Sequence, residues 1–147
     1  MGFFIDGLDP RNEKGDYFHN NVCWWRPLWN YICCVSNDVL DENDRTMGHC
    51  NNDHIISELK ADKIAKRLIR LAETGEMQKA VRQYENWRKS LPEMEECYVC
   101  EVLGRDKCGH CDGSGKEQNW KVEYSMSVEN VKEFIEFVRN SGGFIIS

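Results

Sequence analysis

The chain has no apolar run of about 18 residues, the length that a membrane-spanning helix needs. Residues Met1 to Asp6 lack the basic start and the long apolar stretch of a secretory signal. The sequence also has no glycine loop for phosphates, no nucleophile elbow and no metalloprotease helix. We therefore expect a cytoplasmic protein, and a binding protein rather than an enzyme.

Charge is unevenly spread over the 147 residues, whose net charge is −6. Residues 1–57 carry 4 basic and 9 acidic groups (−5), residues 58–90 carry 9 and 5 (+4), and residues 91–147 carry 6 and 11 (−5). An acidic chain argues against broad nucleic-acid binding, which depends on neutralising phosphates. The basic stretch indicates a solvated helix face or a surface for a phosphate-bearing ligand. A content of 41% hydrophobic residues suffices for one core, so residues 1–147 should form a single domain.

Four of the eight cysteines form two Cys-x-x-Cys pairs, Cys97 with Cys100 and Cys108 with Cys111. Four thiolates at this spacing predict a closed tetrahedral zinc site, which is structural because no coordination position stays open. A disulfide or a redox pair is the competing interpretation, and His110 is an alternative ligand within the second pair. The other cysteines are expected to be buried thiols.

The second pair continues as C-x-x-C-x-G-x-G, with Gly113 and Gly115 after Cys111. Glycines here allow a tight turn with positive φ and direct backbone amides at the sulfurs. The run resembles the knuckle of DnaJ-type zinc modules, which implies a small zinc subdomain at about residues 95–117. The chain has two such knuckles where a DnaJ module has four, so chaperone function is not carried over.

Periodicity predicts an α+β fold with about four helices, a small sheet and the four-cysteine knuckle. A strand is expected at residues 2–5, and a helix at residues 22–35 capped by Asn20 or Asn21. A long polar connection should follow. The remaining expected elements are helices at 58–73 and 76–90 packed antiparallel, a strand at 120–126, a helix after Ser127, and a strand at 144–146.

The most unusual part of the chain is the aromatic segment that contains Trp24, Trp25 and Trp29. Neighbouring residues on a helix point about 100° apart, so these rings should not share one face. They form either a tryptophan-rich core or a stacking wall.

The polar loop at residues 49–54 is interpreted as a structural turn, a ligand pocket or a metal site. We predict that a nucleotide-like ligand binds a pocket lined by Trp24, Trp25, Arg26, His49, Asn52 and His54.

Residues 17–57 resemble small uncharacterised proteins of bacteriophages and prophages, through Asn20 to Trp29, Gly48-His49 and Asn51 to His54. The resemblance implies a counter-defence protein acting in a bacterial host. Such a protein sequesters a nucleotide signal, or it blocks a host protein through an acidic surface in the manner of an anti-CRISPR. A small hydrolase or lyase using His49, Asp53 and His54 is the enzymatic alternative, and a homo-oligomer remains open.

Overall fold

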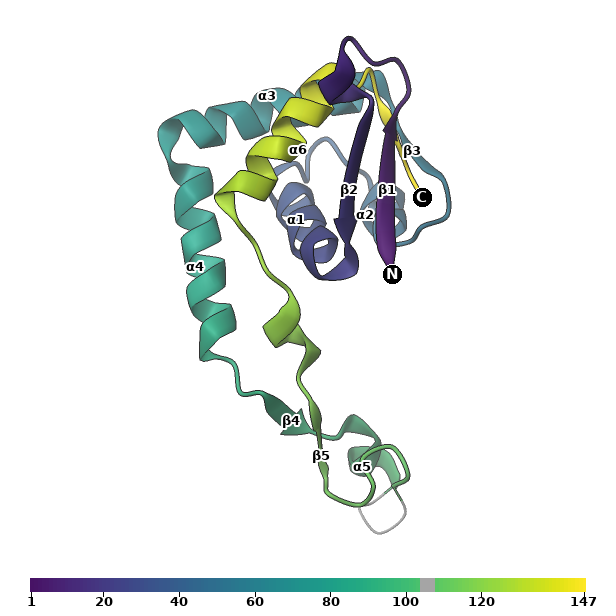
Figure 1. Ribbon diagram of the computed structural model, residues 1–147, viewed down its shortest axis with the longest axis vertical. Coiled ribbons are helices and arrows are strands. Elements are labelled where there is room, and N and C mark those ends of the chain that lie inside the picture. The colour runs from purple at the N-terminus through teal and green to yellow at the C-terminus, as the bar shows by residue number, and fades with distance from the viewer. Residues whose placement is uncertain (104–107) are drawn as a thin grey trace.

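The fold was analysed in a computed structural model, which describes residues 1–103 and 108–147. It is α+β, as predicted, and its main sheet has four antiparallel strands in the order β2-β1-β6-β3 (Figure 1). The strands are β1 (Gly2–Gly7), β2 (Tyr17–Asn21), β3 (His54–Ile56) and β6 (Phe144–Ile146). The predicted strands at both ends of the chain are therefore confirmed, and they pair with each other.

Two helices, α1 (Val22–Val35) and α6 (Val128–Asn140), cover one face of this sheet (Figure 1). Phe3 of β1 stacks on Trp25 at 5.8 Å between ring centroids, and Phe18 of β2 meets the edge of Phe134 at 5.4 Å. The opposite face presents side chains to solvent, among them Phe4 (48% exposed) and Tyr17. The core therefore lies between the sheet and its helices.

Short side chains cap the helices as the sequence predicts. Asn21 accepts hydrogen bonds from the amides of Cys23 and Trp24, and Ser57 caps α3 (Glu58–Thr74) by accepting from Lys60. Ser127 does the same for α6. Gly75, at φ 82°, separates α3 from α4 (Glu76–Ser90), a conformation that favours glycine.

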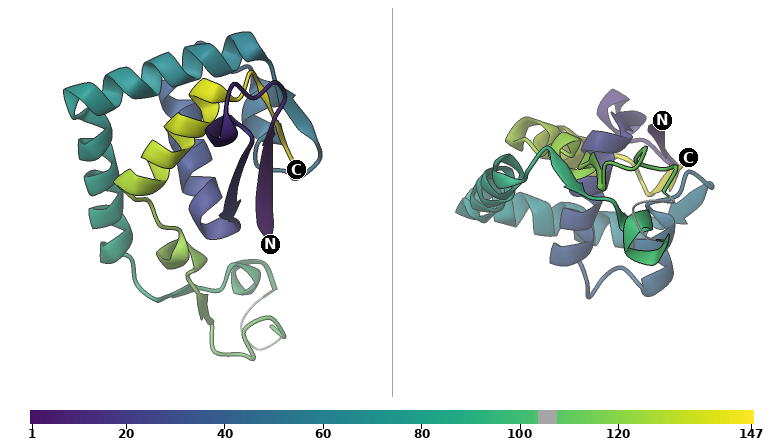
Figure 2. Two further views of the ribbon diagram at one scale, coloured as in Figure 1. Left: turned by 45° about the horizontal axis from the view of Figure 1, so that its top comes forward. Right: turned by 90° about the horizontal axis from the view of Figure 1, so that it is seen from below.

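The predicted antiparallel packing of α3 and α4 is wrong. In two views α4 turns away from α3 at a steep angle, and α6 lies beside α3 instead (Figures 1 and 2). The buried residues of α4, Met77 and Val81, both lie in its first two turns. Beyond these turns α4 runs outward from the body, and Tyr84 bonds the returning segment at Tyr124 rather than α3.

The predicted strand at residues 120–126 is also wrong. Residues Trp120–Glu123 form a 3₁₀ helix, η3, whose Trp120 is 63% exposed, so the alternating pattern does not mark a buried face. The polar connection at residues 36–57 likewise contains regular structure that was not predicted. It includes α2 (Glu42–Met47) and strand β3.

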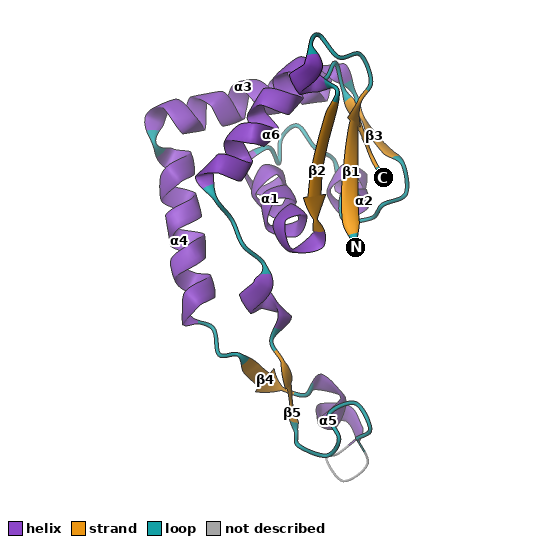
Figure 3. Cartoon of the chain, in the orientation of Figure 1, coloured by secondary structure: helices purple, strands orange, loops and turns teal. Residues whose placement is uncertain are grey.

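An extension leaves the body along α4 and returns along η3 (Figure 3). Its far part contains β4 (Met94–Glu96) paired with β5 (Lys116–Gln118), and the short helix α5 (Tyr98–Leu103). The Tyr84 hydroxyl donates to the Tyr124 carbonyl at 2.6 Å, and Arg88 donates to the Val122 carbonyl at 2.6 Å. These bonds join the outgoing and returning segments. No helix in the described residues is long and apolar enough to cross a membrane.

Candidate metal centre

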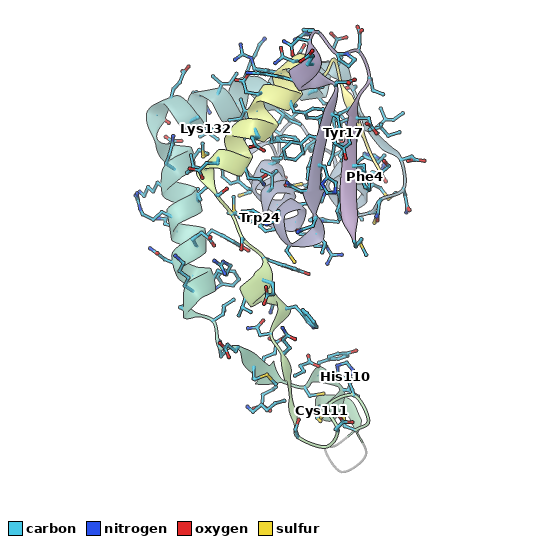
Figure 4. The ribbon with its side chains drawn as sticks, viewed as in Figure 1. Phe4, Tyr17, Trp24, His110, Cys111 and Lys132 are labelled. Atoms are coloured by element: carbon cyan, nitrogen blue, oxygen red, sulfur yellow. The ribbon has the colours of Figure 1, made fainter. Side chains whose placement is uncertain are left out.

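The four predicted cysteines meet at the far end of the extension, where Figure 4 labels Cys111 and His110. All four sulfurs lie within 4.8 Å of one another. Cys97 Sγ is 3.7 Å from Cys108 Sγ, and Cys100 Sγ is 3.5 Å from Cys111 Sγ. A zinc ion with Zn–S bonds of about 2.3 Å needs sulfurs about 3.8 Å apart. The cluster therefore has the dimensions of a four-thiolate metal site.

The β4–β5 hairpin brings the two Cys-x-x-Cys pairs together. Cys97 directly follows β4, and its amide donates to the Gly115 carbonyl just before β5 at 2.9 Å. Cys100 lies in α5, and its amide donates to the Cys97 carbonyl at 3.1 Å. Residues 104–107 of the predicted zinc subdomain lie outside the described residues.

The glycines after Cys111 have the predicted conformation. Gly113 and Gly115 have φ values of 79° and 76°, and the Gly115 amide donates to Cys111 Sγ at 3.2 Å. Burial opposes ionisation of Cys111, but this amide and the neighbouring thiols lower its pKa to about 6. Burial raises the pKa of Cys97 and of Cys100. The Gly115 amide thus favours the thiolate form of Cys111, which is the form that binds a metal.

His110 has another partner. Its Nε2 lies 2.8 Å from Glu117 Oε2, and its ring meets the Tyr98 ring at 5.4 Å. Cys97, His110 and Glu117 also bring their ligand atoms within 4.8 Å of one another. The four-cysteine set offers one more ligand and four atoms of the same kind, so it is the more complete coordination shell.

Searches of protein-family models, curated proteins and solved structures found no significant match to this chain. The likeness to a DnaJ-type knuckle therefore rests on the cysteine and glycine pattern and on the cluster geometry. These observations support a metal site of the knuckle kind, held by four cysteines.

Two of the three clustered tryptophans belong to the core. Trp25 and Trp29 are fully buried and stack at 5.5 Å between ring centroids. The Trp25 indole donates to the Gly48 carbonyl at 2.8 Å, and the Trp29 indole donates to the Arg45 carbonyl at 3.2 Å. These bonds fasten α1 to the segment around α2, and they leave Trp25 without a free face for a ligand.

Trp24 is half-buried and stands apart from that core. It lines a small cavity of about 270 Å³. The other residues that line this cavity are Asn20, Ser127, Glu129, Asn130 and Glu133. The Asn20 and Asn130 amides exchange hydrogen bonds of 3.0 and 2.9 Å across it. This cavity contains none of the other residues predicted for the ligand pocket.

The remaining predicted ligand residues occupy different surroundings. Arg26 Nη1 donates to the Tyr124 hydroxyl at 3.4 Å, and the Arg26 charge acts on His49. Asn52 is exposed. The Arg26 charge thus reaches His49, whereas the Trp25 ring, although bonded to the neighbouring Gly48 carbonyl, is buried.

His54 belongs to an ion network that the sequence analysis did not find. Its Nε2 lies 2.9 Å from Asp44 Oδ1, and the Lys60 ammonium also contacts the Asp44 carboxylate. The Asp44 side chain is 5% exposed and accepts from the Asp41 amide in a capping box. The capping box was the sequence feature that could have predicted this network and α2, but its second residue is aspartate rather than the usual glutamate or glutamine. Asp53, named in the enzymatic alternative, is exposed and has φ 57°.

Changing Asp44 to alanine should destabilise the body by about 3–5 kcal/mol, because it leaves Lys60 without its buried counter-charge and His54 without its hydrogen-bond partner. Asp41→Ala is the matched control, since this acid contacts Lys60 from an exposed position. Urea denaturation should show a clearly larger loss for Asp44→Ala. Equal losses would mean that the network contributes no more than the helix cap.

His49 should make the protein less stable in acid. Burial first, and then the Arg26 charge, lower the pKa of His49 below the ordinary value of about 6.5. His49 therefore binds a proton more readily in the unfolded chain than in the folded protein. Its contribution to the free energy of unfolding is complete above about pH 6.5 and is lost as the pH falls through the lower pKa of the folded state. The free energy of unfolding should fall less between pH 7.5 and pH 5 in His49→Asn than in the wild type. Parallel pH profiles would contradict this assignment.

Proposed function

We propose that this protein is a non-enzymatic binding protein whose extension holds one structural zinc ion and docks on another protein. The four-cysteine cluster at the end of the extension carries the proposal. Soft thiolates in a tetrahedral arrangement favour zinc, and four protein ligands leave no position for substrate. An ion here fixes the shape of the tip, which is what a docking element needs.

The surface of the extension supports docking. Large apolar side chains are exposed along it, namely Trp87 (48%), Met94 (51%), Tyr98 (63%) and Trp120 (63%). Aromatic residues and methionine are enriched where proteins bind each other. Residues 91–124, which form the far part of the extension and its return, also carry a charge of −4, from 4 basic and 8 acidic groups. An apolar and acidic surface suits a partner with a basic rim around an apolar patch.

The phage-type resemblance of residues 17–57 supplies the biological setting of the proposal. A counter-defence protein in a bacterial host would use the extension to block a host protein. The body would then serve as the scaffold that presents the tip. In this setting the partner is a basic component of the host defence.

Affinity capture from bacterial lysate tests this function. The wild type should retain a partner in a salt-dependent manner, and Trp87→Ala with Trp120→Ala should release it. Leu59→Ala, which removes a 66% exposed side chain from the body, is the matched control and should leave capture unchanged. Equal capture by all three proteins would place the contact elsewhere and overturn the proposal.

Sequestration of a nucleotide-like ligand is the second candidate function. The association of Arg26 with His49, and the half-exposed ring of Trp24, support it. Trp25 and His54 would then shape the site from within, because both side chains have internal partners. A panel of linear and cyclic nucleotides should raise the melting temperature of the wild type but not of Trp24→Ala. No shift with any nucleotide would reject this candidate.

A further inference from the structure

A groove on the outer side of α3 is strongly basic. Its volume is about 450 Å³. It is lined by Asp38, Val39, Lys63, Lys66, Arg67 and Arg70. The four cations lie at helical positions i, i+3, i+4 and i+7, which share one face and span about 10 Å along the axis. The groove thus gathers four positive charges within a protein of net charge −6.

One cation in the groove is already neutralised. Arg67 forms a two-pronged ion pair with Asp38, with distances of 2.6 and 2.9 Å, and also donates to the Val35 carbonyl at 2.6 Å. This guanidinium lowers the pKa of Asp38 to about 2. Arg67 is therefore a fixed part of the groove wall, and Asp38 pairs chiefly with Arg67, with a weaker electrostatic contribution from Lys63.

The other three cations make no ion pair with any described residue. Lys63 and Arg70 are exposed, as is Lys66. The acids near the start of α3 are occupied elsewhere, since Glu58 and Asp62 contact Arg11. The groove therefore holds an uncompensated charge of about +3, in which like charges repel at i, i+3 and i, i+4 spacing.

The chemistry of the lining selects the ligand. Val39 is the one apolar side chain in the described lining, which contains no aromatic ring to stack on a base. Lysine ammonium and arginine guanidinium groups are the usual partners of phosphate oxygens. Three spaced cations in an open groove fit several linked phosphates better than a single one.

We propose that this groove binds a short chain of linked phosphates, free or as the tail of a nucleotide, through Lys63, Lys66 and Arg70. The site is separate from the zinc-bearing extension and from Trp24, so it stands independently of the proposed function. The bound chain would relieve the repulsion along α3. Binding should therefore stabilise the body and should weaken steeply with salt.

Calorimetric titration of the whole protein with tripolyphosphate at low salt tests the proposal. The double variant Lys66→Ala with Arg70→Ala should lose about tenfold or more in affinity, as fewer phosphate charges are neutralised. Lys79→Ala with Arg82→Ala on α4 is the matched control, because it removes the same charge from exposed positions outside the groove. Equal affinities for the two double variants would overturn the site.

The choice of titrant distinguishes the sources of phosphate. A nucleoside triphosphate should bind about as tightly as tripolyphosphate, and the nucleoside alone should not bind. A nucleoside triphosphate that binds far more tightly would show that the base is recognised, which contradicts a groove that reads phosphates only. Tighter binding of a single-stranded oligonucleotide than of tripolyphosphate would likewise replace the proposal with nucleic-acid binding.

Discussion

Replacing Cys97 and Cys108 with serine, or removing the metal with a chelator, is expected to unfold residues 94–118 at the far end of the extension and leave the body folded. The body has its own core, which includes Trp25, Phe134 and Ile64. In the described part of residues 91–118, the buried side chains belong to Cys97 and Cys108 alone. Burial of apolar side chains therefore contributes little to the folding stability of this segment. Zinc binding to small fingers contributes about 10–16 kcal/mol, which is enough to replace a core.

Elemental analysis and hydrogen exchange check this prediction. The wild type should contain about one zinc ion per chain. The double variant should contain none and should lose exchange protection in residues 94–118 only. Cys34→Ser, an exposed thiol outside the cluster, and His110→Ala should both retain the ion. A variant that keeps stoichiometric metal, or a body that unfolds with the extension, would contradict the prediction.

Gly48→Ala is expected to destabilise the body by about 3 kcal/mol or more, through overpacking against a rigid ring. A Cβ at this position would lie 2.1 Å from Cε2 and Nε1 of Trp29. The Gly48 carbonyl also accepts the Trp25 indole hydrogen bond at 2.8 Å, so a backbone shift that relieved the clash would strain or break this bond. The backbone itself is ordinary, with φ −64°, and the cost is therefore purely steric.

Chemical denaturation measures this cost. Gly109→Ala is the control, because a Cβ there meets nothing within 4 Å, and its free energy of unfolding should stay close to that of the wild type. A Gly48→Ala protein as stable as the control would show that α1 and its tryptophans shift without cost.

Features set by nearby residues could be predicted from the sequence. Ser57 caps α3 by accepting from an amide only three residues ahead, and Gly75 ends α3 because glycine readily adopts a positive φ. The cysteine cluster is of the same kind, since each half lies within one short turn and the glycines aim an amide at Cys111. In each case the chemistry of a few consecutive residues determines the geometry.

Features set by distant residues could not be predicted. The angle between α3 and α4 depends on which helix covers α3, and that helix is α6, at the other end of the chain. The pairing of Asp44 with His54 and Lys60 requires α2, β3 and α3 to converge. The predicted pocket required the polar loop to fold back on the start of α1 and leave Trp25 open to a ligand, but Trp25 is buried by its packing on Phe3 and Trp29.

The two hydrogen bonds from α4 to the carbonyls of Val122 and Tyr124 should restrict how the far end of the extension moves. Tyr84 and Arg88 link two chain segments, one that leads out of the body and one that leads back (Figure 3). Two linked segments resist bending within the plane that contains both, because such bending must stretch one segment and compress the other. Bending out of this plane does neither, so the tip should swing along a single arc. A docked partner would therefore be carried along that arc with its orientation to the tip preserved.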